Sequence, residues 1–249
     1  SIFGGFNTGT EEQPNPFVPI YMTLTAGRQG DAMIGVEYRG NIGEQVREIS
    51  KGEYLEVNIP GNKVFWATEQ AITSGSDSTN YSASSNQVIK IDGKEIEIAA
   101  GDNIDIIIDK INNSGVSVKA SKGGINNLIL NTTVPHQIWL EDKGSGTVMQ
   151  DLGLINKNFP QPPNNIDPTA SIGGMSIFEM MIQVRDDLVR GDQELVGGRD
   201  LGLIDGALDN ILRHLAATGA RQSRADELAK RAEYEKGNIT ELLAKTEGI

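Results

Sequence analysis

The chain has 249 residues, a formal net charge of −12 and no cysteine. A surface this acidic repels a phosphate backbone, so nucleic acid is not an expected partner. The lack of cysteine excludes disulfides, thiolate metal sites and cysteine nucleophiles. The longest apolar run, residues 64–67, is far shorter than the roughly 20 residues of a membrane-spanning helix, so no membrane insertion is expected.

The first 30 residues carry few signals of regular structure. Pro14, Pro16 and Pro19 are spaced too closely for a helix, and the remainder is rich in Gly, Thr and Asn. We therefore expect residues 1–30 to form an extended segment with turns that packs on a neighbouring part of the protein.

The next region has strand character. Between residues 32 and 65, short runs such as 33–38 and 54–59 are separated by glycines, which predicts a small β region. Residues 73–86 are mostly Ser, Thr, Asn and Gly, a composition typical of a surface loop.

The segment from 89 to 140 is the best specified. Apolar and polar residues alternate on both sides of Asp92-Gly93, the pair that favours a two-residue hairpin turn. An i, i+3, i+4, i+7 stripe beginning at Ile104 then predicts a short amphipathic helix, with Asp102 as its N-cap and Gly115 as its stop. Further strands are expected at 116–120, 127–131 and 136–140, which together make a compact α+β unit.

The composition changes again after residue 155. Four prolines between 156 and 170 predict a linker, placed at 161–170. Ser176 and Glu179 then form a capping-box pattern, and Gly191 is expected to end the helix that follows. The apolar face of this first helix comprises Ile177, Met181, Val184 and Leu188.

From Leu201 onward there is no proline, and a 3,4 spacing persists to the end of the chain. A single helix over this stretch would be about 70 Å long, longer than anything else in the chain could cover. We therefore expect its seam to pack against another segment or another chain. The seam residues are Ile204, Leu208, Ile211, Leu215, Thr218, Gln222, Ala225, Ala229, Ala232, Ile239 and Leu243.

A search for catalytic or ligand-binding patterns yields no site. The only histidines, His136 and His214, have no acidic or nucleophilic neighbour at a motif spacing, so packing or surface roles are expected. Asp102, Asp105 and Asp109 occupy successive turns of the short helix and could be read as ligands of a hard metal ion. The simpler interpretation is that Asp102 caps the helix, that Asp105 interacts favourably with the positive end of the helix dipole, and that Asp109 is solvated. No catalytic, cofactor-binding or metal-binding residue is predicted, and the protein is not expected to be an enzyme.

Short motifs spread over most of the chain share one family resemblance. Residues 2–8, Ile-Phe-Gly-Gly-Phe-Asn-Thr, are followed by Pro16-Phe17, by 38–49 and by 57–65, and residues 218–224 read Thr-Gly-Ala-Arg-Gln-Ser-Arg. They resemble the bacterial flagellin superfamily, and the N-terminal motifs favour within it the family of hook-associated protein 3, the hook–filament junction proteins, over flagellin itself. Residues 88–155 resemble the flagellin hook insertion motif, which the whole superfamily shares. The signature residues are Phe3, Gly4, Gly5, Asn7, Gly219, Ala220, Arg221 and Arg224.

The resemblance does not extend over the whole chain. It leaves out about residues 66–87 and 156–170, and Ser223 and Ala225-Asp226 depart from the commoner Asn and Leu-Glu. The chain begins without methionine and ends within a helical pattern, so it is expected to be a fragment lacking the ascending N-terminal helices and both extreme termini.

The resemblance implies an α+β fold in which long rod-like helices pack as a coiled coil and carry a β-rich insertion facing outward. It implies an extracellular structural protein of the flagellum that is exported unfolded by the type III apparatus with a chaperone. It further implies assembly with copies of itself in a ring, and contacts with other hook-associated proteins and flagellin. The expected domains are an extended segment (1–30), an outer β-rich domain (31–160), a linker (161–170) and a helical rod (171–249).

Two other functions remain open at this stage. One is a filament flagellin with an unusual insertion. The other is an adhesin or carbohydrate-binding module, for which Trp66, Trp139 and Tyr81 are the candidate sugar contacts, although core packing explains the two tryptophans equally well.

Overall fold

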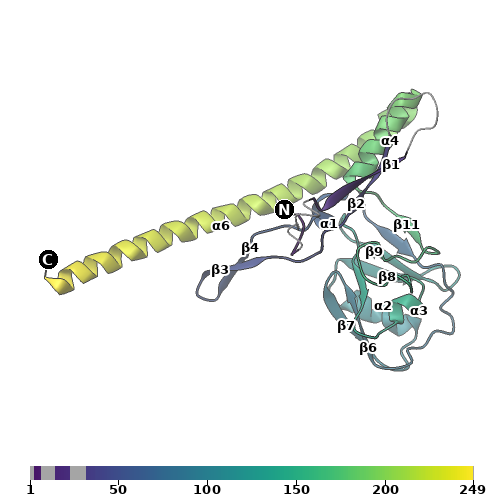
Figure 1. Cartoon of the computed structure of the whole chain (residues 1–249), viewed down its shortest axis with the longest axis horizontal. Coiled ribbons are helices and arrows are strands. Elements are labelled where there is room, and N and C mark those ends of the chain that lie inside the picture. Colours follow the sequence, from purple (N-terminus) through teal and green to yellow (C-terminus); the bar gives the residue numbers. More distant parts are fainter. Residues whose placement is uncertain (1–2, 7–14, 23–31, 249) are drawn as a thin grey trace.

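The computed structural model describes residues 3–6, 15–22 and 32–248. It shows a mixed α/β fold in which one long helix, α6 (Leu201–Glu247), runs from a β-rich module far beyond it (Figure 1). Every residue of α6 from 229 onward is exposed. No helix among the described residues has both the length and the apolar character that a bilayer span requires.

The module contains two antiparallel sheets. In the first, of three strands, the order is β10 (Leu140–Asp142), β6 (Gln87–Ile91) and β7 (Lys94–Ile98). In the second, of four strands, the order is β11 (Ser171–Gly173), β5 (Ala71–Thr73), β9 (Leu128–Thr132) and β8 (Val118–Lys122). Helices α2 (Ile104–Asn113) and α3 (Val148–Asp151) complete the module.

One continuous aliphatic core holds these elements together. The strands contribute alternate residues to it, as Ile89 and Ile91 show, because successive side chains on a strand point to opposite faces. Helix α2 contributes Ile104, Ile107 and Ile111, the stripe that its 3,4 spacing predicts. Phe3, Phe17, Tyr38, Phe65 and Phe178 lie outside this core, in a separate aromatic cluster.

The structure confirms the predicted hairpin between β6 and β7. Ile91 pairs with Lys94 across a two-residue turn, and the turn residues Asp92 and Gly93 have φ angles of 51° and 80°. Positive φ at both positions is what a type I′ turn requires, and this explains the Asp-Gly pair.

The predicted short helix is also present, but its predicted cap is wrong. The N-cap is Asn103, whose Oδ1 accepts a hydrogen bond of 3.0 Å from the Ile106 N–H. The Asp102 carboxylate instead accepts from the Ala99 N–H at 2.7 Å and pairs with Lys110. Asp102 therefore closes the loop that leaves β7, because its side chain reaches backward along the chain.

The strand predicted at 136–140 forms only from Leu140 onward. Asp92 draws the preceding residues onto the β6–β7 turn: its carboxylate lies 2.9 Å from His136 Nε2 and accepts from the Trp139 N–H at 3.0 Å. The Ile138 N–H donates to the Gln70 side chain at 2.7 Å. Side chains thus take the hydrogen bonds that a neighbouring strand would otherwise supply.

The proline-rich segment packs against the module. Asn165 is buried, and its Nδ2 donates to the carbonyl oxygens of Leu140 and Pro160, both at 2.9 Å. Directly after the expected linker, Ser171–Gly173 forms β11 and pairs with β5. The chain therefore stays in the module until residue 173, and the long helices begin only at Ile177.

Two small hairpins connect the module to the helices. β1 (Phe17–Met22) pairs with β2 (Ala32–Tyr38), and β3 (Val46–Ser50) pairs with β4 (Glu53–Glu56). In Figure 1 the β1–β2 hairpin lies beside helix α4 (Ile177–Arg190), and the β3–β4 hairpin lies along α6. The short helix α1 (Gly61–Val64) follows β4 in the chain. Within the expected extended segment 1–30, residues 1–2, 7–14 and 23–30 lie outside the described part.

Substitution of Ile107 by alanine tests the aliphatic core. Ile107 is 0% exposed, whereas its neighbour Ile106 on the same helix is 41% exposed. We expect Ile107→Ala to lower the free energy of unfolding by about 2–5 kcal/mol, because it leaves a cavity in a packed core. The matched control, Ile106→Ala, is expected to lower it by less than about 1 kcal/mol. Urea denaturation of both variants measures the difference, and equal effects would contradict the assignment of this core.

Candidate assembly surface

Helices α4 and α6 form a helical hairpin at the end of the molecule far from the C-terminus (Figure 1). Helix α4 begins with the predicted capping box, since the Ser176 hydroxyl accepts from the Glu179 N–H and the Glu179 carboxylate accepts from the Ser176 N–H. It ends at Gly191, whose φ of 73° stops the helix as predicted. A one-turn helix, α5 (Gln193–Leu195), and a π-helical turn, η1 (Val196–Asp200), then lead into α6.

Buried charges lock this hairpin. The carboxylate of Asp187 is fully buried near the end of α4 and pairs with both Arg190 and Arg199. Arg199 also contacts Asp200 Oδ1 at 3.1 Å, immediately before α6. Removing both arginines would leave the buried Asp187 carboxylate without a cation, so this cluster fixes where the chain reverses.

A small apolar cluster of described residues joins the two helices to each other and to the segment after α1. It comprises Ala67, Ile177, Met180 and Ala207, with Phe65, Met175, Val184 and Leu203 partly buried around them. This is too little apolar burial to cover both helices on all sides.

Polar contacts attach α6 to the segment that follows β4. Asn210 is 0% exposed, and its Nδ2 donates to the carbonyl oxygens of Lys63, Val64 and Trp66 at 3.0, 3.2 and 3.0 Å. One turn later, His214 Nε2 lies 3.1 Å from the Lys63 carbonyl oxygen. These contacts orient one face of α6 toward its own chain.

Two arginines of the C-terminal signature continue this attachment. Arg221 pairs with Glu56, and Arg224 pairs with Glu53, so both hold the β3–β4 hairpin along α6. The signature residues Gly219 and Ala220 are exposed on the same helix. Both ion pairs are partly exposed, so each adds little to the stability of the fold and mainly orients the β3–β4 hairpin along α6.

The N-terminal signature lies in an aromatic cluster where β1, β2, α1 and α4 meet. Phe17 contacts Tyr38, Phe65 and Phe178 with ring centroids 4.8 to 5.2 Å apart, and Phe3 lies 5.0 Å from Phe65. Edge-to-face and tilted pairs at these distances stabilise beyond simple burial. Five side chains from five separate parts of the sequence thus form one joint.

The Tyr38 hydroxyl connects the backbone around this cluster. It lies 2.7 Å from the Phe3 carbonyl oxygen and 2.9 Å from that of Asn41, and it accepts from the Gly61 N–H at 3.2 Å. Burial raises the pKa of Tyr38 to about 12, so the hydroxyl keeps its proton.

Glycine in the N-terminal signature has a steric reason. Gly5 has a φ of 67°, and a Cβ on it would lie 2.2 Å from the carbonyl oxygen of Asn41. Gly4 contributes its carbonyl oxygen to the Asn41 N–H at 3.1 Å. The remaining signature residue of this motif, Asn7, lies outside the described residues.

The proximal part of the predicted α6 seam lies on a face that the described chain leaves open. Its proximal residues Ile204, Leu208, Ile211 and Leu215 are exposed, Leu208 by 50% and Leu215 by 63%. Each directly follows a residue that faces the chain itself, namely Leu203, Ala207, Asn210 and His214. One residue step turns a helix by about 100°, so the open stripe lies about a quarter turn from the covered one.

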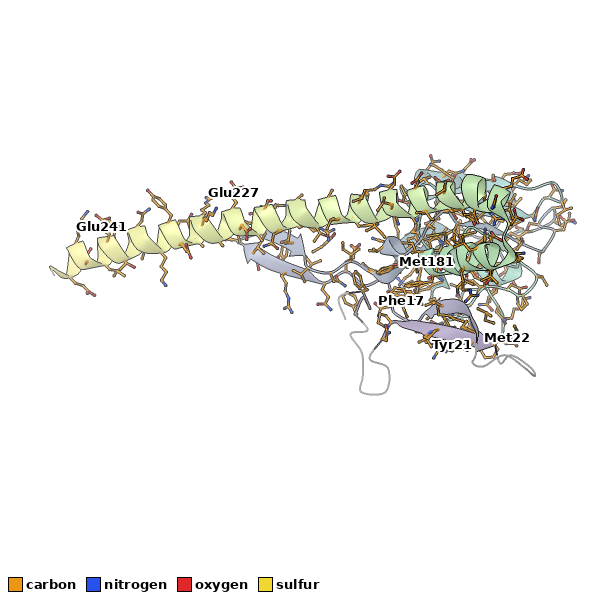
Figure 2. All side chains as sticks on the ribbon, turned by 90° about the horizontal axis from the view of Figure 1, so that it is seen from above. Phe17, Tyr21, Met22, Met181, Glu227 and Glu241 are labelled. Carbon is orange, nitrogen blue, oxygen red and sulfur yellow. The ribbon has the colours of Figure 1, made fainter. Side chains whose placement is uncertain are left out.

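The seam does not include two further exposed apolar residues beside this stripe, Leu201 and Leu212. Farther along, Thr218, Gln222 and Ala225 line a groove of about 440 Å³ between α6 and residues 55–59. The last part of the seam is exposed and comprises Ala229, Ala232, Ile239 and Leu243. Figure 2 shows the distal half of α6 standing free, with Glu227 and Glu241 pointing away from it.

The predicted face of α4 is divided. Ile177 is buried and Val184 is partly buried, whereas Met181 and Leu188 are exposed. Figure 2 shows Met181 on the side of the molecule that also carries Phe17, Tyr21 and Met22 of β1. Tyr21 and Met22 are exposed as well, so apolar surface extends from α4 onto β1.

The titratable groups considered as site residues serve as structural contacts. Asp102 pairs with Lys110, and Asp105 with Lys122 at 2.5 Å. The described residues contain no group of three or more His, Asp or Glu side chains placed to hold a metal ion. The contact between His136 and Asp92 could not be predicted from the sequence, because 44 positions separate the two residues.

The aromatic residues considered for sugar binding are also engaged. Trp139 is buried, and its Nε1 donates to Glu141 Oε1 at 2.7 Å. Tyr81 packs against the aliphatic core, and burial raises its pKa to about 12. Trp66 is partly buried, with Nε1 enclosed by protein.

No family model matches the chain, and no curated protein matches it. Solved structures that resemble it include two from Legionella pneumophila. The flagellar hook-associated protein 3 has a TM-score of 0.34 at 15% identity, covering 100% of this chain and 73% of that one. The flagellar junction protein FlgL has a TM-score of 0.32 at 15% identity, covering 97% and 72%. Scores this low do not establish a shared fold.

The attachment of α6 predicts a pH dependence. Burial, together with the nearby cations Arg213, Lys63 and Arg221, lowers the pKa of His214 below its ordinary value of 6.5. As pH falls through 6.5, the unfolded chain gains a proton that the folded chain resists, so His214 lowers stability on acidification.

We therefore expect the loss of stability between pH 7.5 and pH 5 to be smaller in His214→Gln than in the parent protein. Glutamine retains a donor for the Lys63 carbonyl, and every other titrating group is common to both proteins. Urea denaturation at the two pH values measures the difference. Identical losses in the two proteins would show that His214 is not desolvated.

Proposed function

We propose that this chain is a non-enzymatic structural component of the bacterial flagellum, acting as an adaptor between hook and filament. One observation carries the proposal: α6 extends beyond its module with an apolar stripe that no described segment covers. Contiguous exposed apolar surface of this kind is typical of an interface, and its burial yields about 25 cal/mol for each Å² removed from water.

The sequence motifs that resemble the flagellin superfamily support the same proposal. They come from distant parts of the chain, yet most are structural contacts of the joint between module and helices. Phe3 and Gly5 lie at the aromatic cluster, and Arg221 and Arg224 hold the β3–β4 hairpin. Because these motifs make contacts that hold the module to the helices, proteins built with the same connection are expected to retain them.

In the proposed assembly, α4 and α6 belong to a helical rod and pack as a coiled coil with further helices. The stripe on α6 and the exposed residues of α4 are buried between segments and between copies arranged in a ring. The β-rich module is displayed outward, and the ends of the rod meet flagellin and other hook-associated proteins. Export in an unfolded state with a chaperone, and an extracellular location at the hook–filament junction, complete the proposal.

A filament flagellin is the alternative within the same superfamily. A carbohydrate-binding module is a weaker alternative, because Trp139 is buried and hydrogen-bonded to Glu141 and Tyr81 packs against the aliphatic core. Location in the cell distinguishes the first alternative from a junction protein.

Immunogold labelling of flagellated cells of the source organism tests the location. We expect label at a single position near the cell-proximal end of each filament, because an adaptor occupies only the junction. Label along the whole filament would favour a flagellin, and label away from flagella would contradict a flagellar role.

Charged substitutions test the stripe as an assembly surface. We expect Leu208→Lys and Leu215→Lys each to weaken self-association at least tenfold, because each places a cation in an apolar interface. Ala220→Lys, on a different side of α6, adds the same charge and is the matched control. Sedimentation velocity over a concentration series measures association, and equal effects of all three variants would remove the stripe from the interface.

A further inference from the structure

A cavity of about 360 Å³ lies between the β-rich module and α6. The module lines it with the β6–β7 turn, the residues after α2 and the loop before His136, and α6 lines it with Asn210, Arg213 and His214. Its volume falls at the lower end of the range of small-molecule sites. It lies at the joint itself, so an occupant would touch both parts of the protein.

The cavity is positively charged although the chain as a whole is acidic. Lys63, Lys94 and Arg213 line it, and Asp92 is the one carboxylate among the described residues that does. That carboxylate is already engaged by His136 at 2.9 Å. The whole chain has a net charge of −12, whereas this cavity is lined by three cations and one carboxylate that already has a partner. The local charge is therefore opposite in sign to that of the protein.

Two of these cations are available to a ligand. Lys94 and Arg213 are exposed, and neither forms an ion pair with any residue that the structure describes. Lys63 pairs with Glu44, which does not line the cavity. The lowered pKa of His214, to which Arg213 and Lys63 contribute after burial, agrees with a positive potential here.

Lys94 and Arg213 belong to different parts of the protein that meet at the cavity. Lys94 follows the β6–β7 turn, and its Nζ lies over Gly115, where a Cβ would approach it to 3.3 Å. On α6, Arg213 lies in sequence between Asn210 and His214, which attach α6 to the carbonyls of residues 63–66. The module therefore supplies one of the two unpaired cations and α6 supplies the other.

We propose that this cavity binds a small oxyanion, a carboxylate or phosphate group, between Lys94 of the module and Arg213 of α6. Guanidinium and ammonium groups recognise such anions through charge-assisted hydrogen bonds. A bound anion neutralises cations from both parts of the protein that line the cavity. It therefore strengthens the joint between module and helix and raises the stability of the protein as its concentration rises.

Isothermal titration calorimetry with inorganic phosphate and with citrate, at ionic strength matched by sodium chloride, tests the proposal. We expect at least one of them to bind with one-to-one stoichiometry, and the stronger of the two identifies a phosphate or a carboxylate site. Arg213→Gln and Lys94→Gln are each expected to weaken binding about tenfold or more. Lys230→Gln, which removes the same charge from the distal part of α6, is expected to leave binding unchanged.

Absence of binding by both anions overturns the proposal. Binding that survives both Arg213→Gln and Lys94→Gln, or that falls equally in Lys230→Gln, overturns it too, because it places the anion elsewhere. Both substituted side chains are exposed, and circular dichroism of each variant verifies the fold. Either variant alone decides the outcome if the other fails to fold.

Discussion

The Asn210 side chain makes the contact on which the arrangement of module and helix depends. Its amide donates to three carbonyl oxygens between residues 63 and 66, and His214 Nε2 lies 3.1 Å from the first of them. Buried carbonyls left without a donor cost about 1–3 kcal/mol each, so this side chain stabilises the contact by supplying donors to them. Because it is fully buried, Asn210 also fixes the rotation of α6 about its own axis.

That rotation decides which surface the protein presents. With Leu203, Ala207, Asn210 and His214 turned toward the chain, the residues one position later are turned outward. The outward residues are nevertheless apolar. A long helix whose exposed sides are polar is stable in contact with water. An exposed apolar stripe that no described segment covers instead favours burial in an assembly.

The joint and the module are stabilised by different means. The module has a continuous aliphatic core, and the joint combines an aromatic cluster, the Tyr38 hydroxyl and ion pairs. Polar and aromatic contacts are directional, so they specify an angle between helix and module more strictly than aliphatic packing does. The basic cavity is lined by Lys63, Asn210 and His214, which attach α6 to the chain, and this is why an anion bound there would act on the attachment.

Elements whose signals are local followed from the sequence. Asp92-Gly93 predicts its turn because both residues tolerate positive φ, and Ser176 with Glu179 predicts the start of α4 because capping acts within three residues. The α2 stripe and the length of α6 follow from periodicity alone. Errors arose where a distant side chain intervened, as Asp92 does with the residues before Leu140.

The sequence by itself therefore determined the β6–β7 turn, the extent of α2, α4 and α6, the apolar seam of α6 and the family resemblance of its motifs. Only the tertiary structure decided which face of α6 is covered, since Asn210 finds its acceptor at Lys63, 147 positions earlier. The same holds for the addition of β11 to the sheet of β5 and for the meeting of Lys94 with Arg213 around one cavity. Turn and helix preferences act over a few residues, whereas these contacts exist only after the chain has brought remote segments together.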